Sequence, residues 1–119
     1  MRNYRNIKAW QAADDLTVAV YGNSRKFPRE ETYGLTSQIR RAASSVPANI
    51  VEGCGRESKK DYLHFLYIAR GSLLETEYLL HLATRLEYLS QDTHSVLAAN
   101  AKTAFVLLNG LIRSVEKEV

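Results

Sequence analysis

Residues 38–53 read Gln38-Ile39-Arg40-Arg41-Ala42-Ala43-Ser44-Ser45-Val46-Pro47-Ala48-Asn49-Ile50-Val51-Glu52-Gly53. Apolar residues recur in this stretch at spacings of three and four, which is the period of one helix face. Pro47 interrupts the pattern, because proline lacks a backbone N–H and clashes with the carbonyl four residues earlier. The apolar period nevertheless continues to Ile50 beyond the proline. We therefore predict a helix over residues 29–53 that is kinked at Pro47 and does not end there.

Polar side chains occupy positions of this helix where a simple amphipathic pattern would place apolar ones. Together with one glutamate of the next helix, those that can share a stripe are Gln38, Arg41, Ser45, Asn49, Glu52 and Glu75. Buried polar groups need hydrogen-bonding partners, so one interpretation is a structural network that sets the register of the helices. The other interpretation is contact with an anion or RNA through Arg40 and Arg41. We favour the network, with Arg41 as a paired partner and Arg40 facing solvent.

Three further helices are predicted from their apolar periodicity, over residues 6–25, 59–89 and 92–117. Phe27-Pro28 ends the first, because the residue before a proline is disfavoured in the α region. Ser58 is a capping residue for the third. Short connections make consecutive helices antiparallel neighbours. We predict that residues 1–119 form a single all-α domain, an antiparallel up-and-down four-helix bundle with a proline-kinked second helix.

The third helix carries apolar residues on more than one face. Between Tyr62 and Ala69, His64 is the only polar residue. Packing against one side cannot cover a helix that is apolar all round. We therefore predict a second buried face, and with it an oligomer.

Composition narrows the class of protein. The 119 residues carry a net charge of +3, with the positive excess in the first half. No run reaches the ~18 apolar residues of a membrane span, and the N-terminus lacks the apolar region of a secretory signal. Cys54 is the single cysteine, so no internal disulfide can form, which suits a reducing compartment. We expect a cytoplasmic protein with no membrane partner.

Catalytic and metal-binding patterns are not found in the sequence. No Glu-x-x-His pair of the di-iron bundles occurs, and no phosphate-binding glycine loop or nucleophile elbow. Cys54 lies at a helix C-terminus, where the helix dipole raises a thiol pKa. We expect no metal, no cofactor and no enzymatic activity.

Basic residues gather at two of the predicted turns. The set is Arg25, Lys26 and Arg29 at the first turn and Arg56, Lys59 and Lys60 at the second. These turns lie at opposite ends of an antiparallel bundle, and each patch would become a ring in an oligomer, where the positive potentials add. As candidate nucleic-acid-binding residues we name Arg40, Arg41, Arg56, Lys59 and Lys60.

Three groups of residues resemble the motifs of one family. They are Phe27-Pro28 with Glu31 and Tyr33-Gly34-Leu35; Gln38-Ile39-Arg40-Arg41-Ala42 with Ser45-Val46-Pro47, Asn49-Ile50 and Glu52-Gly53; and Ala69-Arg70-Gly71-Ser72-Leu73 with Glu75. The family is that of the four helix bundle proteins, first noticed as products of intervening sequences in bacterial 23S ribosomal RNA genes. The accessory variability proteins of retroelements are similar. The chain departs from the pattern at Val51, where alanine is usual, and at Gly22, late in the first helix.

This resemblance implies a four-helix bundle that assembles into a homopentamer, with no known enzymatic activity and with RNA or DNA as a partner. Two functional hypotheses follow. The first is a non-enzymatic homo-oligomer that binds RNA or DNA through basic residues. The alternative is a protein-interaction or scaffolding module without nucleic-acid binding.

Overall fold

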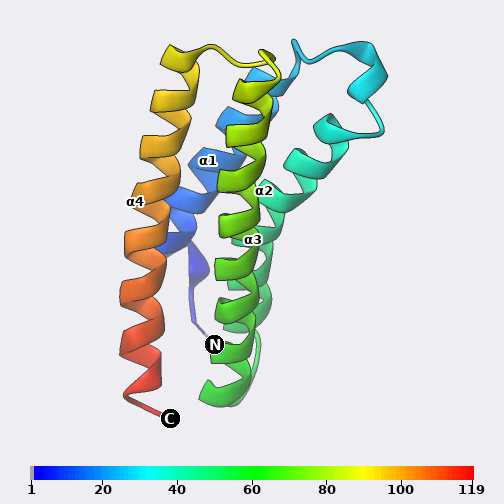
Figure 1. Ribbon diagram of the computed structural model, residues 1–119. Helices are drawn as coiled ribbons and strands as arrows, with labels where there is room; N and C mark the ends of the chain where they lie inside the picture. Colours follow the sequence, from blue (N-terminus) through cyan, green and yellow to red (C-terminus); the bar gives the residue numbers. More distant parts are fainter. Residues whose placement is uncertain (1) are drawn as a thin grey trace.

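The computed structural model describes residues 2–119, which form four α-helices and two short 3-10 helices without any strand (Figure 1). The elements in chain order are η1 (Tyr4–Asn6), α1 (Lys8–Ser24), η2 (Arg29–Glu31), α2 (Leu35–Cys54), α3 (Lys59–Arg85) and α4 (Gln91–Glu116).

The four long helices pack side by side as an up-and-down bundle. Helices that follow one another in the chain pack together, and α1 also packs against α4, which closes the ring. The bundle measures 44 × 25 × 20 Å. The predicted all-α bundle is confirmed.

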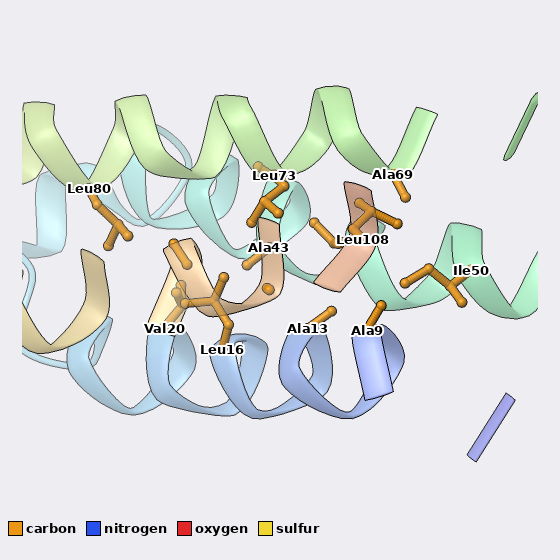
Figure 2. Packing of buried hydrophobic residues seen from close by; sticks show 14 of the residues in the cluster. Ala9, Ala13, Leu16, Val20, Ala43, Ile50, Ala69, Leu73, Leu80 and Leu108 are labelled. Atoms are coloured by element: carbon orange, nitrogen blue, oxygen red, sulfur yellow. The ribbon is translucent and has the colours of Figure 1, made fainter. Parts of the chain in front are cut away.

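The interior follows the apolar periodicity. The seam predicted along α3 is fully buried, and it comprises Tyr62, Leu66, Ala69, Leu73, Thr76, Leu80 and Ala83. Figure 2 shows Leu16 and Val20 of α1 pointing into the same interior as Leu73 and Leu80 of α3. Burial of each such leucine contributes roughly 1.5–3 kcal/mol. Small residues such as Ala43 let the helices approach closely.

The second helix begins later than predicted. Residues 29–31 form the separate turn η2, and α2 starts only at Leu35. Gly34 has φ −108° and ψ −115°, which is not helical, and the Glu31 Oε1 atom accepts a hydrogen bond from the Leu35 N–H at 3.0 Å. The side chain of η2 therefore caps α2 across the turn, and the predicted start at residue 29 is wrong.

From Leu35, α2 runs without interruption through the buried Pro47 to Cys54. The helix thus continues past the proline as expected, while the kink itself stays a prediction. Near its end, a Cβ atom on Gly53 would lie 2.8 Å from Tyr62 Cδ1 of α3. Glycine is needed there because the two helices approach too closely for a side chain.

The other helix boundaries are set by local capping groups. α3 begins after Ser58, whose Oγ accepts a hydrogen bond from the Asp61 N–H at 3.0 Å. It ends at Arg85, short of the predicted residue 89, because Glu87 has a φ of 65° in the left-handed region. α4 lies close to its predicted range, and α1 begins at Lys8, not at residue 6.

Candidate functional site

The connection between α1 and α2 forms one wall of an open cavity of about 300 Å³. We call it the α1–α2 cleft. Its lining comes from the last turn of α1, the connection and the first two turns of α2, namely Tyr21, Thr32, Tyr33, Thr36, Ser37, Arg40 and Arg41. Figure 1 shows this connection (blue to cyan) projecting from the bundle, with the start of α2 diverging from α3. The cleft joins hydroxyl groups, two phenol rings and two guanidinium groups.

Arg40 is held in place on one side of the cleft. Its Nε donates to Ser24 Oγ at 2.8 Å and its Nη2 to the Tyr21 carbonyl at 3.3 Å. The guanidinium carbon lies 4.8 Å from the centre of the Tyr21 ring, a cation–π distance. Arg40 therefore satisfies polar groups in the last turn of α1 while its charge stays at the cleft. The expectation that Arg40 faces solvent freely is corrected, since it is half-buried.

Arg41 differs from its neighbour. Its side chain is exposed, and among residues 2–119 it enters no ion pair. The prediction that Arg41 is a buried, paired partner is therefore wrong. The reason is geometric, because adjacent residues lie about 100° apart around a helix, so Arg40 turns toward α1 and Arg41 does not.

Tyr33 lies at the tip of the connection and is 96% exposed. The turn that carries it is anchored through Glu31, whose Oε2 atom accepts a hydrogen bond from the Tyr88 hydroxyl at 2.9 Å while Oε1 caps α2. These two bonds, chiefly the one from the Leu35 N–H, lower the pKa of Glu31. The same contact with Glu31 raises the pKa of Tyr88. An ionised carboxylate thus ties the tip to the α3–α4 connection.

Further cations surround the cleft. Arg25, Lys26 and Arg29 lie in or beside the connection that carries Thr32 and Tyr33, and all three are exposed. In the described part of the chain none of them enters an ion pair. Their charge is therefore available to an anion near the cleft.

The second predicted basic cluster lies at the α2–α3 turn, at the other end of the bundle. Arg56 pairs with Glu52 at 2.7 Å, and Lys59 pairs with Glu118 at 3.0 Å. Lys60 is exposed. Two of these three cations are therefore partly neutralised by partners within the chain, whereas the cations at the cleft are not.

The predicted polar network forms in a smaller version, between α2 and α3. Ser45 Oγ lies 2.9 Å from Ser72 Oγ, and Asn49 Nδ2 donates to the Ser45 carbonyl at 2.8 Å. Gln38 makes a long hydrogen bond of 3.4 Å to Glu75. The sequence did not identify Ser72 as a member of this network. Ser72 lies one turn before Thr76 of the buried α3 seam, and that position could have indicated it.

Arg41 and Glu52 lie outside this network. Glu52 is exposed and bonds Arg56 one turn later, instead of a residue of α3. The prediction that Arg41 and Glu52 belong to the network is wrong, because their positions around α2 face away from the contact with α3.

The outer face of α4 is a second feature that the sequence analysis did not identify. Within residues 2–119, α4 is the one helix whose length and composition would allow it to cross a membrane. Of its most apolar stretch of 18 residues, 28% is buried in the bundle. Val96 and Val106 are 61% and 58% exposed. An open cavity of about 440 Å³ lies on this face, lined by Ala99, Lys102, Thr103, Val106 and Leu107. A core helix of a soluble protein can be equally long and apolar, but such a helix is mostly buried, so the informative point is the apolar character of the uncovered side of α4.

Cys54 and the acidic and histidine side chains form no evident reactive cluster. Cys54 is buried, and burial raises the pKa of its thiol. Over residues 2–119, no three side chains of His, Cys, Asp or Glu come close enough to share a metal ion.

Comparison with known proteins connects these features to a family. A family model described as "23S rRNA-intervening sequence protein" matches residues 5–110. No curated protein matches the chain. Among solved structures, the chain is similar to a protein of unknown function from the S23 ribosomal protein family of Bacteroides thetaiotaomicron, with a TM-score of 0.80 and 24% identity over 88% of this chain and 95% of that chain. At that identity, the likeness shows the fold.

Proposed function

The chain belongs to the 23S rRNA-intervening sequence protein family, and from this premise we propose that it is a non-enzymatic, homo-oligomeric bundle that binds RNA or DNA at the α1–α2 cleft. The observation that carries the proposal is the contrast between the two basic clusters. Arg41 and the cations of the connection have no acidic partner among residues 2–119, whereas Arg56 and Lys59 are paired. Unpaired cations can replace the counterions of a phosphate backbone without first breaking an ion pair.

The hydroxyls of the cleft suit the same ligand. Thr32, Thr36 and Ser37 line the cavity beside the two arginines. Phosphate oxygens in nucleic-acid complexes accept hydrogen bonds from arginine, lysine, serine and threonine side chains. Of the five residues named from the sequence, the cleft contains Arg40 and Arg41, so the proposal rests on these two and leaves Arg56, Lys59 and Lys60 as secondary.

The test is a titration of fluorescently labelled 23S ribosomal RNA fragments at several salt concentrations, followed by anisotropy. We expect affinity to fall steeply with salt, because each phosphate contact releases counterions. Arg41→Ala should weaken binding and flatten the salt dependence by about one unit of slope. Lys8→Ala, which removes an exposed cation at the start of α1, far along that helix from the cleft, is the matched control and should leave binding unchanged. Affinity that is absent, or that does not depend on salt, overturns the proposal.

Self-association is the second part of the proposal, and the outer face of α4 supports it. Val96 and Val106 lie exposed on a helix that carries a single charge, Lys102, between His94 and Ile112. Contiguous apolar surface on a soluble protein marks an interaction site. On α3, Leu74 and Tyr78 are 50% and 58% exposed and add to the apolar surface of the bundle. The number five comes from the family resemblance.

Light scattering at micromolar concentration tests this part. We expect a mass of several chains for the native protein, and Val106→Asp should lower it because a charge would enter the interface. Val119→Asp places the same charge at the chain end, where it should leave the mass unchanged. A native protein that scatters as one chain overturns self-association.

The alternative function, a protein-interaction module without nucleic-acid binding, is favoured by the same face of α4. The two experiments separate the hypotheses. An oligomer that fails to bind RNA or DNA at low salt supports the alternative. The proposal also assigns the protein to the cytoplasm, where RNA and DNA are available to it.

A further inference from the structure

We propose that the α1–α2 cleft takes single-stranded nucleic acid and that Tyr33 stacks on one of its bases. This inference rests on the proposed function, because it names the class of nucleic acid bound at the same site. The contacts of the tyrosines across the bundle carry it.

Tyr33 is the exception among the seven tyrosines of the chain. Each of the other six lies against another aromatic ring or an arginine, in contacts that involve Tyr4, Tyr21, Tyr62, Tyr67, Tyr78 and Tyr88. Tyr33 makes no such contact in residues 2–119 and is 96% exposed. Its ring contributes nothing to the packing of the bundle, and both of its faces are open to a ligand.

The ring is nevertheless presented by an anchored turn. A Cβ atom on Gly34, the next residue, would lie 2.7 Å from Glu31 Oε1, so a side chain there would displace the carboxylate that caps α2. Glu31 in turn binds the Leu35 N–H and the Tyr88 hydroxyl, and Thr32 Oγ1 donates to the Arg29 carbonyl at 2.7 Å. A pre-ordered turn loses less conformational entropy on binding than a mobile loop would.

The rest of the cleft supplies polar and charged groups for the backbone of a single-stranded nucleic acid, in addition to the ring that stacks on a base. Arg41 and the hydroxyls of Thr36 and Ser37 line the same cavity as Tyr33, and they can contact phosphate. An aromatic ring beside cations that follow the backbone is the usual combination of proteins that bind single strands.

The shape of the site argues against a duplex. The cleft is a concavity of about 300 Å³, at the small end of the range for ligand sites. Double-stranded DNA is read by a helix or ribbon that enters a groove, and a base within a duplex does not expose its face to a ring. The strand therefore has to offer an unstacked base.

The experiment compares a labelled single-stranded oligonucleotide with a duplex of the same length at low salt. The native protein should bind the single strand more tightly. Tyr33→Ala should weaken that binding by about five- to a hundredfold, the usual cost of losing one stacked base, whereas Tyr33→Phe should retain affinity within about twofold because its ring still stacks. Val18→Ala removes an exposed apolar side chain of α1 outside the cleft and should have no effect. Circular dichroism should be unchanged in all three variants.

The outcomes separate this inference from the function on which it rests. If the native protein binds neither ligand, the proposed function fails and the inference fails with it. If Arg41→Ala weakens binding while Tyr33→Ala does not, the nucleic-acid function stands and stacking on Tyr33 is refuted. Tighter binding of the duplex also refutes the inference. Loss in Tyr33→Ala with retention in Tyr33→Phe supports it.

Discussion

The Arg40 Nε atom donates a hydrogen bond to the Ser24 hydroxyl at 2.8 Å, so a guanidinium of α2 closes the last turn of α1. The two residues are sixteen positions apart in the chain, and Ser24 is one of the few buried polar side chains. Arg40 therefore has a structural role, which its exposed neighbour Arg41 does not share. Loss of Arg40 should therefore lower stability, whereas loss of Arg41 should affect ligand binding alone.

We predict that Arg40→Ala lowers the free energy of unfolding by about 1–3 kcal/mol, because it breaks charge-assisted hydrogen bonds and leaves the Ser24 oxygen without its donor, although the Ser24 hydroxyl still donates to the Tyr21 carbonyl. Arg41→Ala should change it by less than about 0.5 kcal/mol, as is usual for surface positions. Urea unfolding followed by circular dichroism measures both. Equal losses for the two variants would contradict the division of roles.

The network between α2 and α3 should matter more to stability than the surface ion pairs. Ser45→Ala should cost about 1 kcal/mol, because Ser72 and Asn49 both lose a partner. Glu52→Ala should cost between 0 and about 1 kcal/mol, since its pair with Arg56 is solvent-exposed.

A double-mutant cycle checks the assignment of the network. Combining Ser45→Ala with Ser72→Ala should cost less than the sum of the single changes by about 0.5 kcal/mol or more. Strict additivity would show that the two hydroxyls do not interact in solution.

Two glycines within helices should respond in opposite directions to a methyl group. Gly53→Ala should destabilise the protein by about 1–3 kcal/mol, because its Cβ would lie 2.8 Å from Tyr62 Cδ1. Gly71→Ala should stabilise it by roughly 0.5–1 kcal/mol, because nothing lies within 4 Å of its Cβ position and alanine is the better helix former. Thermal unfolding of both variants is the measurement. A destabilising Gly71→Ala would instead indicate that another surface packs against this face of α3.

The Glu31 cap makes the start of α2 sensitive to acid. Its pKa is lowered in the folded protein from the ordinary 4.5, chiefly by the bond from the Leu35 N–H and then by Tyr88. A lowered folded pKa means that the stabilisation is complete above pH 4.5 and is lost as the pH falls through the folded pKa. Glu31→Gln should therefore melt below the native protein at neutral pH, and the difference should disappear in acid.

Glu30→Gln provides the control for this pH dependence, because it removes the same charge from the neighbouring position. Its melting temperature should stay close to that of the native protein at every pH. A difference between native protein and Glu31→Gln that persists unchanged in acid would show that the carboxylate charge is not what caps α2.

Much of the fold could be predicted because the relevant information is local. The α3 seam, the Ser58 cap and the passage of α2 through Pro47 all follow from spacing and from the chemistry of single residues. The start of α2 could not be predicted in the same way. Pro28 and the two glutamates after it suit a first helical turn. In the structure, however, the Glu31 carboxylate accepts one hydrogen bond from the Leu35 N–H, beyond Gly34, and another from the Tyr88 hydroxyl.

The candidate site was only partly accessible to sequence reasoning. Arg40 and Arg41 were both identified, yet their roles were exchanged, because the helical angle that separates them has meaning only once the place of α1 is known. Tyr33 belongs to one of the motifs that the sequence shares with the family, but its isolation appears only when the contacts of the other six tyrosines are known.

The sequence by itself determined four helices, their order and the residues of the interior, because the 3.6-residue period of apolar side chains depends on nothing beyond the chain nearby. The tertiary structure alone decided which polar groups are paired. Arg40 finds Ser24, Ser45 finds Ser72 and Lys59 finds Glu118 across distances in the chain that no local pattern encodes. Hydrogen bonds and ion pairs act over about 3 Å, so the packing of the helices determines which cations of this bundle stay free to meet an anion.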